Sequence, residues 1–321
     1  MTVEMRRRRG KRKEKIPVLL ITDIGRDIDD TLALLTISGY REEIELVGVV
    51  ATGGNGANRA MLAKSWLSHL QLDKVKVCAC LADGKSEIEF PTFLTRVLLK
   101  SQIDARTLIT DLLRKYSHAL RIVAIAPLSP LLPLVREQKT LDLLRQNTHS
   151  LWIQGQLIEQ GKTILPDVQN AYNLRIDANA SRQVFEKLQH DVPFRFLGKH
   201  AAYQVSLTPQ DFASFDTILP YMSDMAKQFL RPFRNRRPEL FRKLYGGNHV
   251  DDEFENLDAL SHPYDAALIV TLVHDHVLRD VQFRHKFIGN TSDTVLSKEH
   301  ANLVHSELVR TIQLGLTEFI K

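Results

Sequence analysis

An unusually acidic segment follows the first apolar run of the chain. Residues 23–30 read Asp-Ile-Gly-Arg-Asp-Ile-Asp-Asp, so four carboxylates stand within eight residues. Crowded carboxylates repel one another unless a cation neutralises them, and Ca²⁺ and Mg²⁺ prefer oxygen ligands of this kind. A helix N-cap with surface acids explains Asp29 or Asp30 well, but it explains Asp23 at the end of a strand poorly. The segment therefore predicts a site for a divalent cation.

Two other acidic-loop motifs fit this segment badly. An EF-hand needs a glycine at its sixth position and a glutamate at its twelfth, and counting from Asp23 or Asp27 finds neither. A phosphotransferase with an aspartyl nucleophile would place a second acid two residues after that nucleophile. Gly25 stands there instead.

Short β-branched runs alternate with amphipathic segments along the chain, which predicts repeated strand and helix units. The expected strands cover residues 16–22, 44–51, 75–80, 121–126, 149–154 and 194–198. The expected helices cover residues 31–38, 57–70, 105–120, 177–189, a long apolar stretch from Pro263, and 298–320. Gly39 is expected to stop the first helix in the left-handed conformation. The pattern predicts an α/β fold with an open, mostly parallel sheet and helices on both faces, a Rossmann-like core.

Ligands of open parallel sheets bind at the carboxyl ends of the strands. The acidic segment follows the first strand, and Gly53-Gly54-Asn55-Gly56 follows the second. The glycine cluster alone is an ordinary tight turn, because it lacks the lysine and hydroxyl residue of a Walker loop. Beside the acidic segment, Asn55 offers an amide suited to a sugar hydroxyl. Residues 211–248 interrupt the alternation, and we expect inserted helices there, over the sheet's edge.

These residues resemble the inosine-uridine preferring nucleoside hydrolase family, whose first strand ends in an Asp-x-Asp-x-Gly-x-Asp-Asp run. The resemblance covers nearly the whole folded body. It includes Ala126-Pro127-Leu128-Ser129, Tyr172-Asn173 with Asp177 before a helix, and Asp265 at the start of a late helix. It implies the nucleoside hydrolase fold and metal-dependent hydrolysis of a ribonucleoside to free base and ribose.

The resemblance also implies a role for individual residues. The implied ligands of a bound Ca²⁺ are Asp23, Asp30, the backbone carbonyl of Ile125, and Asp265. The implied sugar-binding residues are Asp29, Asn55 and Asn173. Fixed carboxylates would stabilise the ribosyl cation of the transition state. The ion would lower the pKa of a bound water, from which Asp23 would remove a proton as general base.

The sequence departs from the family pattern in ways that leave roles open. Two extra residues between Gly25 and the paired acids leave Asp27 between metal-binding, sugar-binding and structural roles. Tyr264 stands where well-known members carry a histidine associated with protonating the leaving base. A phenol, with a pKa near 10, is a poorer acid, so catalysis and plain packing stay equally open for Tyr264. Ala171 replaces a glutamate that often contacts the sugar.

The identity of the leaving group is left open by the sequence. A possible pocket wall for the base is formed by His200, Tyr203, Tyr245, His249 and His262. The alternatives to a nucleoside hydrolase are a hydrolase of a different N-riboside and a non-catalytic binder of ribose or nucleosides.

Charge is concentrated at the start of the chain. Residues 1–15 hold eight basic and two acidic residues, a net +6, so the rest of the 321-residue chain carries −1 of the total +5. Like charges repel, so we expect a disordered basic tail ahead of a single domain at 16–321. A solvated extension is favoured over a nuclear-import signal, and nucleic-acid contact is expected only as nonspecific contact by this tail.

Several further expectations concern the whole protein. The 44% apolar content permits a substantial core. The sequence contains no run of eighteen apolar residues, so no membrane span is expected. Cys78 and Cys80 are expected to be reduced core residues, which fits a cytoplasmic protein, with nuclear location possible from the tail. Relatives commonly form dimers or tetramers, so a homo-oligomer is expected.

Overall fold

The fold is described from a computed structural model of the chain. It describes residues 14–25, 29–54, 56–80, 103–207, 211, 262–280 and 284–319. Of the residues singled out above, Asp27, Asn55, Tyr245 and His249 lie outside these ranges, as do residues 1–13 and all of the 211–248 segment except Asp211.

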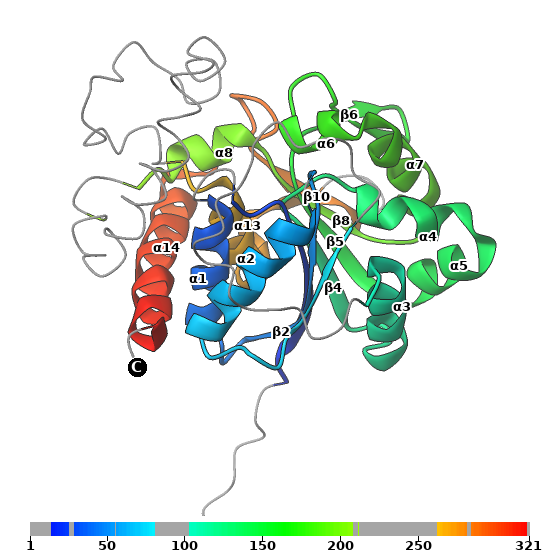
Figure 1. Cartoon of the computed structure of the whole chain (residues 1–321). Helices are drawn as coiled ribbons and strands as arrows, with labels where there is room; N and C mark the ends of the chain where they lie inside the picture. The colour runs from blue at the N-terminus through cyan, green and yellow to red at the C-terminus, as the bar shows by residue number, and fades with distance from the viewer. Residues whose placement is uncertain are drawn as a thin grey trace, which may run out of the picture.

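A central eight-stranded sheet organises the molecule (Figure 1). Its order is β3-β2-β1-β4-β5-β8-β10-β9, and every pairing is parallel except that of β9 with β10. The strands are β1 (Ile16–Thr22), β2 (Ile44–Ala51), β3 (Lys76–Ala79), β4 (Leu120–Ala124), β5 (Thr148–Gln154), β8 (Phe194–Leu197), β9 (Arg279–Asp280) and β10 (Lys286–Ile288). A separate hairpin, β6 (Leu157–Gln160) and β7 (Thr163–Pro166), follows β5. The predicted mostly parallel sheet is confirmed.

Strand β1 lies in the middle of the sheet, between β2 and β4. Its sequence IPVLLIT is apolar on both faces, and every residue after Ile16 is buried. A parallel strand covered by helices on both faces needs such a continuous run. The register pairs Thr22 with Ala51 and Ile21 with Ala124, so β1, β2 and β4 end side by side.

Helices cover both faces of the sheet. The longer ones are α1 (Asp29–Gly39), α2 (Gly56–His69), α3 (Ala105–Lys115), α5 (Gln138–Asn147), α7 (Ala178–Leu188), α13 (Tyr264–Val273) and α14 (Lys298–Phe319). Shorter ones are α4 (Leu132–Arg136), α6 (Tyr172–Ile176) and α8 (Lys199–Gln204), with 3₁₀ turns at Ser129–Leu131 and Asp275–Val277. One core cluster joins the sheet to α1, α2, α13 and α14, and a second joins it to α3, α4, α5 and α7.

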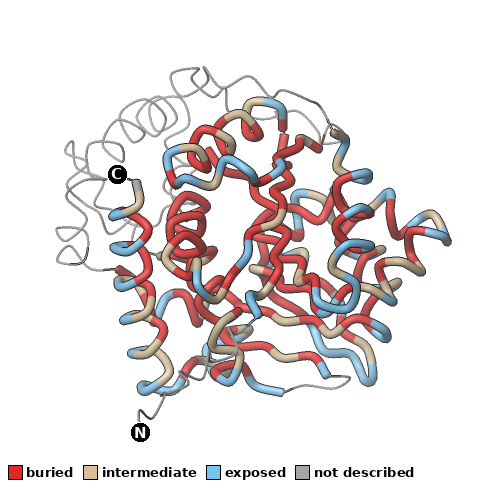
Figure 2. The backbone as a smooth tube through the Cα atoms, turned by 90° about the horizontal axis from the view of Figure 1, so that it is seen from below, coloured by how far each residue is buried: buried red, intermediate tan, exposed pale blue. Residues whose placement is uncertain are grey.

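Helix α1 is buried from Asp30 to Ser38 because it packs against both α13 and α14 (Figure 1). Figure 2 shows that buried residues gather in the interior of the molecule. The prediction that Gly39 would adopt the left-handed conformation is wrong. Gly39 is the last residue of the helix, and a Cβ there would lie 2.1 Å from the carbonyl oxygen of Thr311 in α14. The glycine is needed for the close approach of two helices.

Further details differ from the sequence-based prediction. The helix expected over 105–120 ends at Lys115, and residues 116–119 form a turn in which His118 has a φ of 62°. The β6–β7 hairpin, the strands β9 and β10, and the short helices α4, α5, α6 and α8 were not predicted. Cys78 and Cys80 are buried free cysteines, as expected, and burial raises the pKa of the Cys78 thiol to about 12.

Candidate active site

Three carboxylates from distant parts of the chain converge at the carboxyl edge of the sheet. Oxygen atoms of Asp29, Asp30 and Asp265 all lie within 4.8 Å of one another. Asp29 and Asp30 open α1, and Asp265 lies in the first turn of α13. The positive ends of two helix dipoles therefore meet here, which favours negative charge. Asp30 and Asp265 are 2% and 3% exposed, so this charge is held away from bulk water.

The last residue of β1 orients Asp30. The Thr22 hydroxyl donates to Asp30 Oδ1 and accepts a hydrogen bond from the backbone N–H of Ile24 at 3.2 Å. The backbone N–H of Asp30 in turn donates to Asp29 Oδ1 at 3.1 Å. These bonds tie the start of α1 to the end of β1, so the two acids are held in place by the strand. Nothing in the sequence pattern identified Thr22 as part of this site.

Asp23 lies next to the turn that follows β2. A Cβ added to Gly53 would lie 2.7 Å from Asp23 Cβ and 3.3 Å from its Oδ2. Gly53 also has a φ of +83°, so both its conformation and the space beside Asp23 require glycine. Asp23 is 9% exposed, and it is not one of the three acids within 4.8 Å among the described residues. It thus sits at the same edge, on the β2 side.

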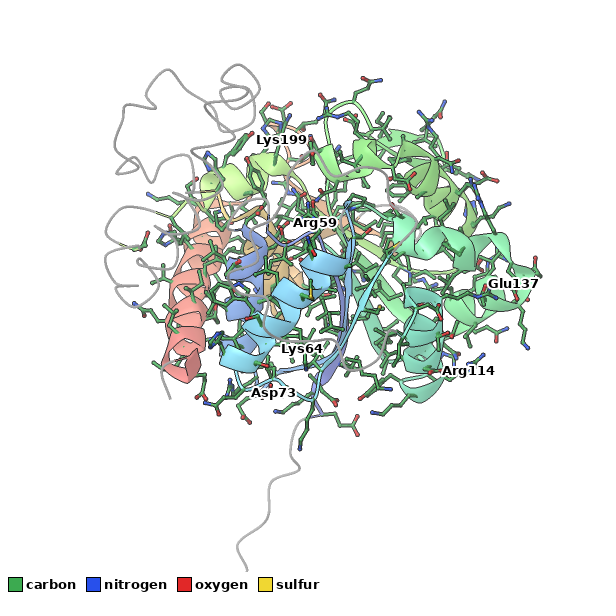
Figure 3. The ribbon with its side chains drawn as sticks, viewed as in Figure 1. Arg59, Lys64, Asp73, Arg114, Glu137 and Lys199 are labelled. Atoms are coloured by element: carbon green, nitrogen blue, oxygen red, sulfur yellow. The ribbon has the colours of Figure 1, made fainter. Side chains whose placement is uncertain are left out.

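Arg59 of α2 joins the loops after β1 and β2. Its guanidinium donates to the carbonyl oxygens of Gly54 at 2.9 Å, Ile24 at 3.0 Å and Gly53 at 3.3 Å. The side chain is buried and lies at the same end of the molecule as Lys199, whereas Lys64 and Asp73 lie towards the other end (Figure 3). The buried guanidinium of Arg59 therefore holds the backbone next to Asp23 in place.

The backbone carbonyl of Ile125 faces a buried amide. Asn173, at the start of α6, donates from Nδ2 to Ile125 O at 3.0 Å and to Gln154 Oε1 at 3.2 Å. The N–H of Ile125 donates to Ile21 O at 2.9 Å, which places this carbonyl beside the end of β1. A carbonyl oxygen has two lone pairs, so Ile125 O can accept from Asn173 and still bind a cation.

The donor set fits a hard divalent cation. Buried carboxylates and a backbone carbonyl are the ligands that Ca²⁺ and Mg²⁺ prefer, and three oxygens within 4.8 Å can share one ion. The described residues of this cluster include no cysteine or histidine ligand, so softer metals are less suited to it.

The profile of the inosine-uridine preferring nucleoside hydrolases matches residues 18–304, most of the chain. The chain belongs to this family. It is therefore an N-ribohydrolase, an enzyme that cleaves the bond between a ribose and its leaving group. The family is metal-dependent, and the cluster of Asp29, Asp30 and Asp265 could bind a metal ion. A search among curated proteins found no match.

Solved nucleoside hydrolases and an effector protein share the fold. The type III effector protein XopQ, in complex with adenosine diphosphate ribose, is 19% identical over 94% of each chain, with a TM-score of 0.73. A plant nucleoside hydrolase is 14% identical over 94% of this chain and 99% of its own, with a TM-score of 0.63. The purine-preferring ribonucleoside hydrolase of Gardnerella vaginalis is 17% identical over 93% and 99%, also with a TM-score of 0.63. These identities support the fold alone.

Around the N-terminus of α13, this nucleoside hydrolase gathers an aromatic group, comprising Tyr203, His262 and Tyr264. The ring centroid of Tyr203 lies 4.9 Å from that of His262 and 5.9 Å from that of Tyr264. The ring of His200 lies 6.0 Å from that of Tyr203. The Ser206 hydroxyl is 2.6 Å from His262 Nδ1 and fixes that ring. Tyr264 and Asp265 are consecutive, so the aromatic group borders the acidic cluster.

The remaining residues of the family resemblance have structural contacts. Asp177 caps α7 by accepting from the Ala180 N–H at 2.9 Å, and the Ser129 hydroxyl donates to its other oxygen at 2.8 Å. Ala171, which replaces the glutamate of the family pattern, is a buried apolar residue before α6. Sequence reasoning missed Arg59 and Gln154, whose positions in a helix and at a strand end carry no motif.

Proposed function

We propose that this enzyme hydrolyses the N-glycosidic bond of a ribonucleoside, releasing free base and ribose, with Ca²⁺ as its metal. The observation that carries this proposal is the convergence of Asp29, Asp30 and Asp265 at the carboxyl edge of the sheet. The Ca²⁺ ligands would be Asp23, Asp30, Asp265 and the carbonyl of Ile125. When bound, the ion supplies Lewis-acid polarisation of the oxygens that it contacts.

The carboxylates of the chain would have two catalytic roles. Cleavage of the N-glycosidic bond develops positive charge on the ribose ring, and fixed buried carboxylates stabilise that charge without having to reorganise. Asp23 would take a proton from the attacking water as general base. Asp29, half-buried at the mouth of the cluster, would accept from ribose hydroxyls, and Asn173 would bind the sugar from the β4 side. Asn55 and Asp27 are further candidates for the sugar.

Tyr264 would protonate the leaving base. Its phenol lies in the aromatic group, where a flat base can pack against Tyr203 and His262. The same environment is compatible with a packing role for Tyr264, so the residue needs a direct test.

One assay tests the proposal. Purified protein is incubated with Ca²⁺ and a panel of nucleosides, and free base and ribose are measured. Turnover is expected, and Asp23→Asn should abolish it while circular dichroism stays unchanged, because the amide cannot accept the proton. Undiminished activity of this variant would remove Asp23 from its role. Tyr264→Phe should slow turnover, and an unchanged rate would assign Tyr264 to packing.

A second candidate function is hydrolysis of a different N-riboside. Two observations favour it: a tyrosine stands at position 264, and a similar structure, an effector, is complexed with adenosine diphosphate ribose. Release of product from adenosine diphosphate ribose but not from nucleosides would support it. Release of base from nucleosides at catalytic rates would exclude it.

A further inference from the structure

We infer that Gln154 is a positioning residue, which together with the backbone carbonyl of Ile125 holds the Asn173 amide so that its Oδ1 accepts a hydrogen bond from a hydroxyl of the ribose. The inference rests on the proposed function and adds a residue to it. Gln154 is the last residue of β5, the strand next to β4, and it is half-buried. Asn173 is 9% exposed, lies in the first turn of α6, and reaches the ends of β4 and β5 through its hydrogen bonds to Ile125 and Gln154.

The polarity follows from a backbone group that cannot be turned around. A backbone carbonyl only accepts hydrogen bonds, so the atom of Asn173 that lies 3.0 Å from Ile125 O must be its nitrogen. That nitrogen carries two protons, and its second acceptor is Gln154 Oε1 at 3.2 Å. Ile125 and Gln154 together use both protons of the amide. The remaining polar atom of Asn173, Oδ1, is an acceptor.

This polarity selects the kind of group that can bind beside Ile125. A ribose hydroxyl can donate its proton to Asn173 Oδ1, whereas a phosphoryl or ether oxygen has no proton to give. If Gln154 lost its acceptor oxygen, one proton of a buried amide would lack a partner, which costs free energy, and the amide would be held by its bond to Ile125 O alone. The substrate would then meet a less firmly positioned acceptor, and its affinity would fall.

The test compares three variants with the wild-type enzyme at saturating Ca²⁺. Gln154→Met keeps the length of the side chain but removes the strong acceptor, and we expect KM to rise about tenfold while kcat changes by less than about twofold, because the lost interaction serves binding. Gln154→Glu keeps an oxygen that can accept from Asn173, so its KM should stay close to wild type. Asn173→Asp places an oxygen against Ile125 O and should raise KM more than Gln154→Met does.

Gln183→Met is the matched control. Gln183 is also half-buried, and its amide also makes two side-chain bonds, with Arg136 at 3.0 Å and Asn179 at 2.7 Å, but it lies on α7 away from the acidic cluster. Its replacement should leave KM unchanged. An equal rise in KM for Gln154→Met and Gln183→Met would overturn the inference, and so would an unchanged KM for Gln154→Met or a failure of Gln154→Glu to restore it.

Ribosides that lack one hydroxyl identify the partner of Asn173. For the 2′-, 3′- or 5′-deoxyriboside that removes this partner, wild type and Gln154→Met should have the same KM. If the KM of Gln154→Met exceeded that of the wild type by the same factor for all three deoxyribosides, the assignment would be contradicted. If the wild type binds nucleosides without cleaving them, dissociation constants replace KM in the same comparison. If the wild type is active and replacement of Gln154 leaves KM unchanged, this inference alone is refuted. If the wild type neither binds nor cleaves nucleosides, the proposed function is refuted as well.

Discussion

The two edges of the central sheet carry opposite charge. At the carboxyl edge, Asp29, Asp30 and Asp265 share a space within 4.8 Å. At the amino edge, the first residues of the strands include Arg121 in β4, Arg195 in β8 and Lys286 in β10. Helix α13 spans the two, with its N-terminal turn at the acids and its C-terminal turn at the bases. Each edge thus carries the charge opposite to that of the helix-dipole end that it meets.

Structural contacts account for the charged residues at the amino edge better than for those at the carboxyl edge. Arg121 donates to Leu272 O at the end of α13 at 2.9 Å, Arg195 donates to Phe194 O and Arg284 O, and Lys286 lies 3.3 Å from an oxygen of Asp275. Backbone carbonyls and one acid therefore account for the bases. Three carboxylates within reach of one ion, two of them buried and one half-buried, exceed what helix capping needs. We take this contrast to separate a structural edge from a functional one.

Of the substitutions at the two edges, replacement of Asp265 should have the largest effect. Asp265→Asn should lower activity by more than about a hundredfold, because it removes a proposed ligand and part of the field that stabilises the ribosyl cation. It should also abolish the rise in melting temperature that Ca²⁺ causes in the wild type. Asp275→Asn, at the amino edge, serves as control and should leave both properties unchanged. Full activity of Asp265→Asn would place the chemistry elsewhere.

Replacement of Arg59 tests how much its hydrogen bonds to the loops after β1 and β2 stabilise the acidic edge. Arg59→Met leaves three carbonyl oxygens without their donor, and we expect a loss of about 3 kcal/mol in the free energy of unfolding, with lower activity. Arg106, which pairs with Glu137 in an exposed position, provides the matched control. Arg106→Met should cost less than about 1 kcal/mol. Urea unfolding measures both, and equal losses would mean that the buried guanidinium has no special role.

His285 makes the amino edge sensitive to pH. Burial, with a smaller contribution from Arg195, lowers the pKa of His285 to about 4, and its Nδ1 accepts from the Phe194 N–H at 3.0 Å. Because the unfolded chain takes up this proton first, near the ordinary value of 6.5, the stability from neutral His285 is complete above that pH. About 3 kcal/mol or less should be lost as pH falls from 6.5 towards 4.

His285→Asn is the variant for this measurement, since its Oδ1 can replace Nδ1 as acceptor but does not titrate. Urea unfolding of the variant should depend less on pH than that of the wild type between pH 6.5 and 4. Parallel curves for the two proteins would assign the acid sensitivity to other groups.

Arg121 should give the smallest effect. Its burial lowers the pKa of the guanidinium from its ordinary value, yet the group has a good acceptor in Leu272 O. Arg121→Met should therefore cost about 1 kcal/mol of stability and leave KM and kcat unchanged. A large change in KM would show that the amino edge also communicates with the substrate site, and the division between the two edges would fail.

The sequence by itself determined most of the sheet and the nature of the acidic loop. Short continuous apolar runs such as residues 16–22 are typical of strands covered on both faces, and their alternation with helical segments indicates a parallel sheet. Four acids directly after such a strand point to a cation, because local charge repulsion is visible in the sequence alone. Asp265 was connected to them only through the family resemblance, since it lies 235 positions after Asp30 in the chain.

Tertiary structure decided which groups share space. Gly39 was read as a helix stop from its local neighbours, but its reason is the backbone of Thr311 in α14. Arg59 has the appearance of a surface residue, and only the meeting of the β1 and β2 loops gives it three carbonyl partners. Gln154 gains its role because Asn173 of α6 reaches the ends of β4 and β5. Local sequence fixes the backbone preferences of an element, whereas contacts between distant elements depend on how the whole chain packs.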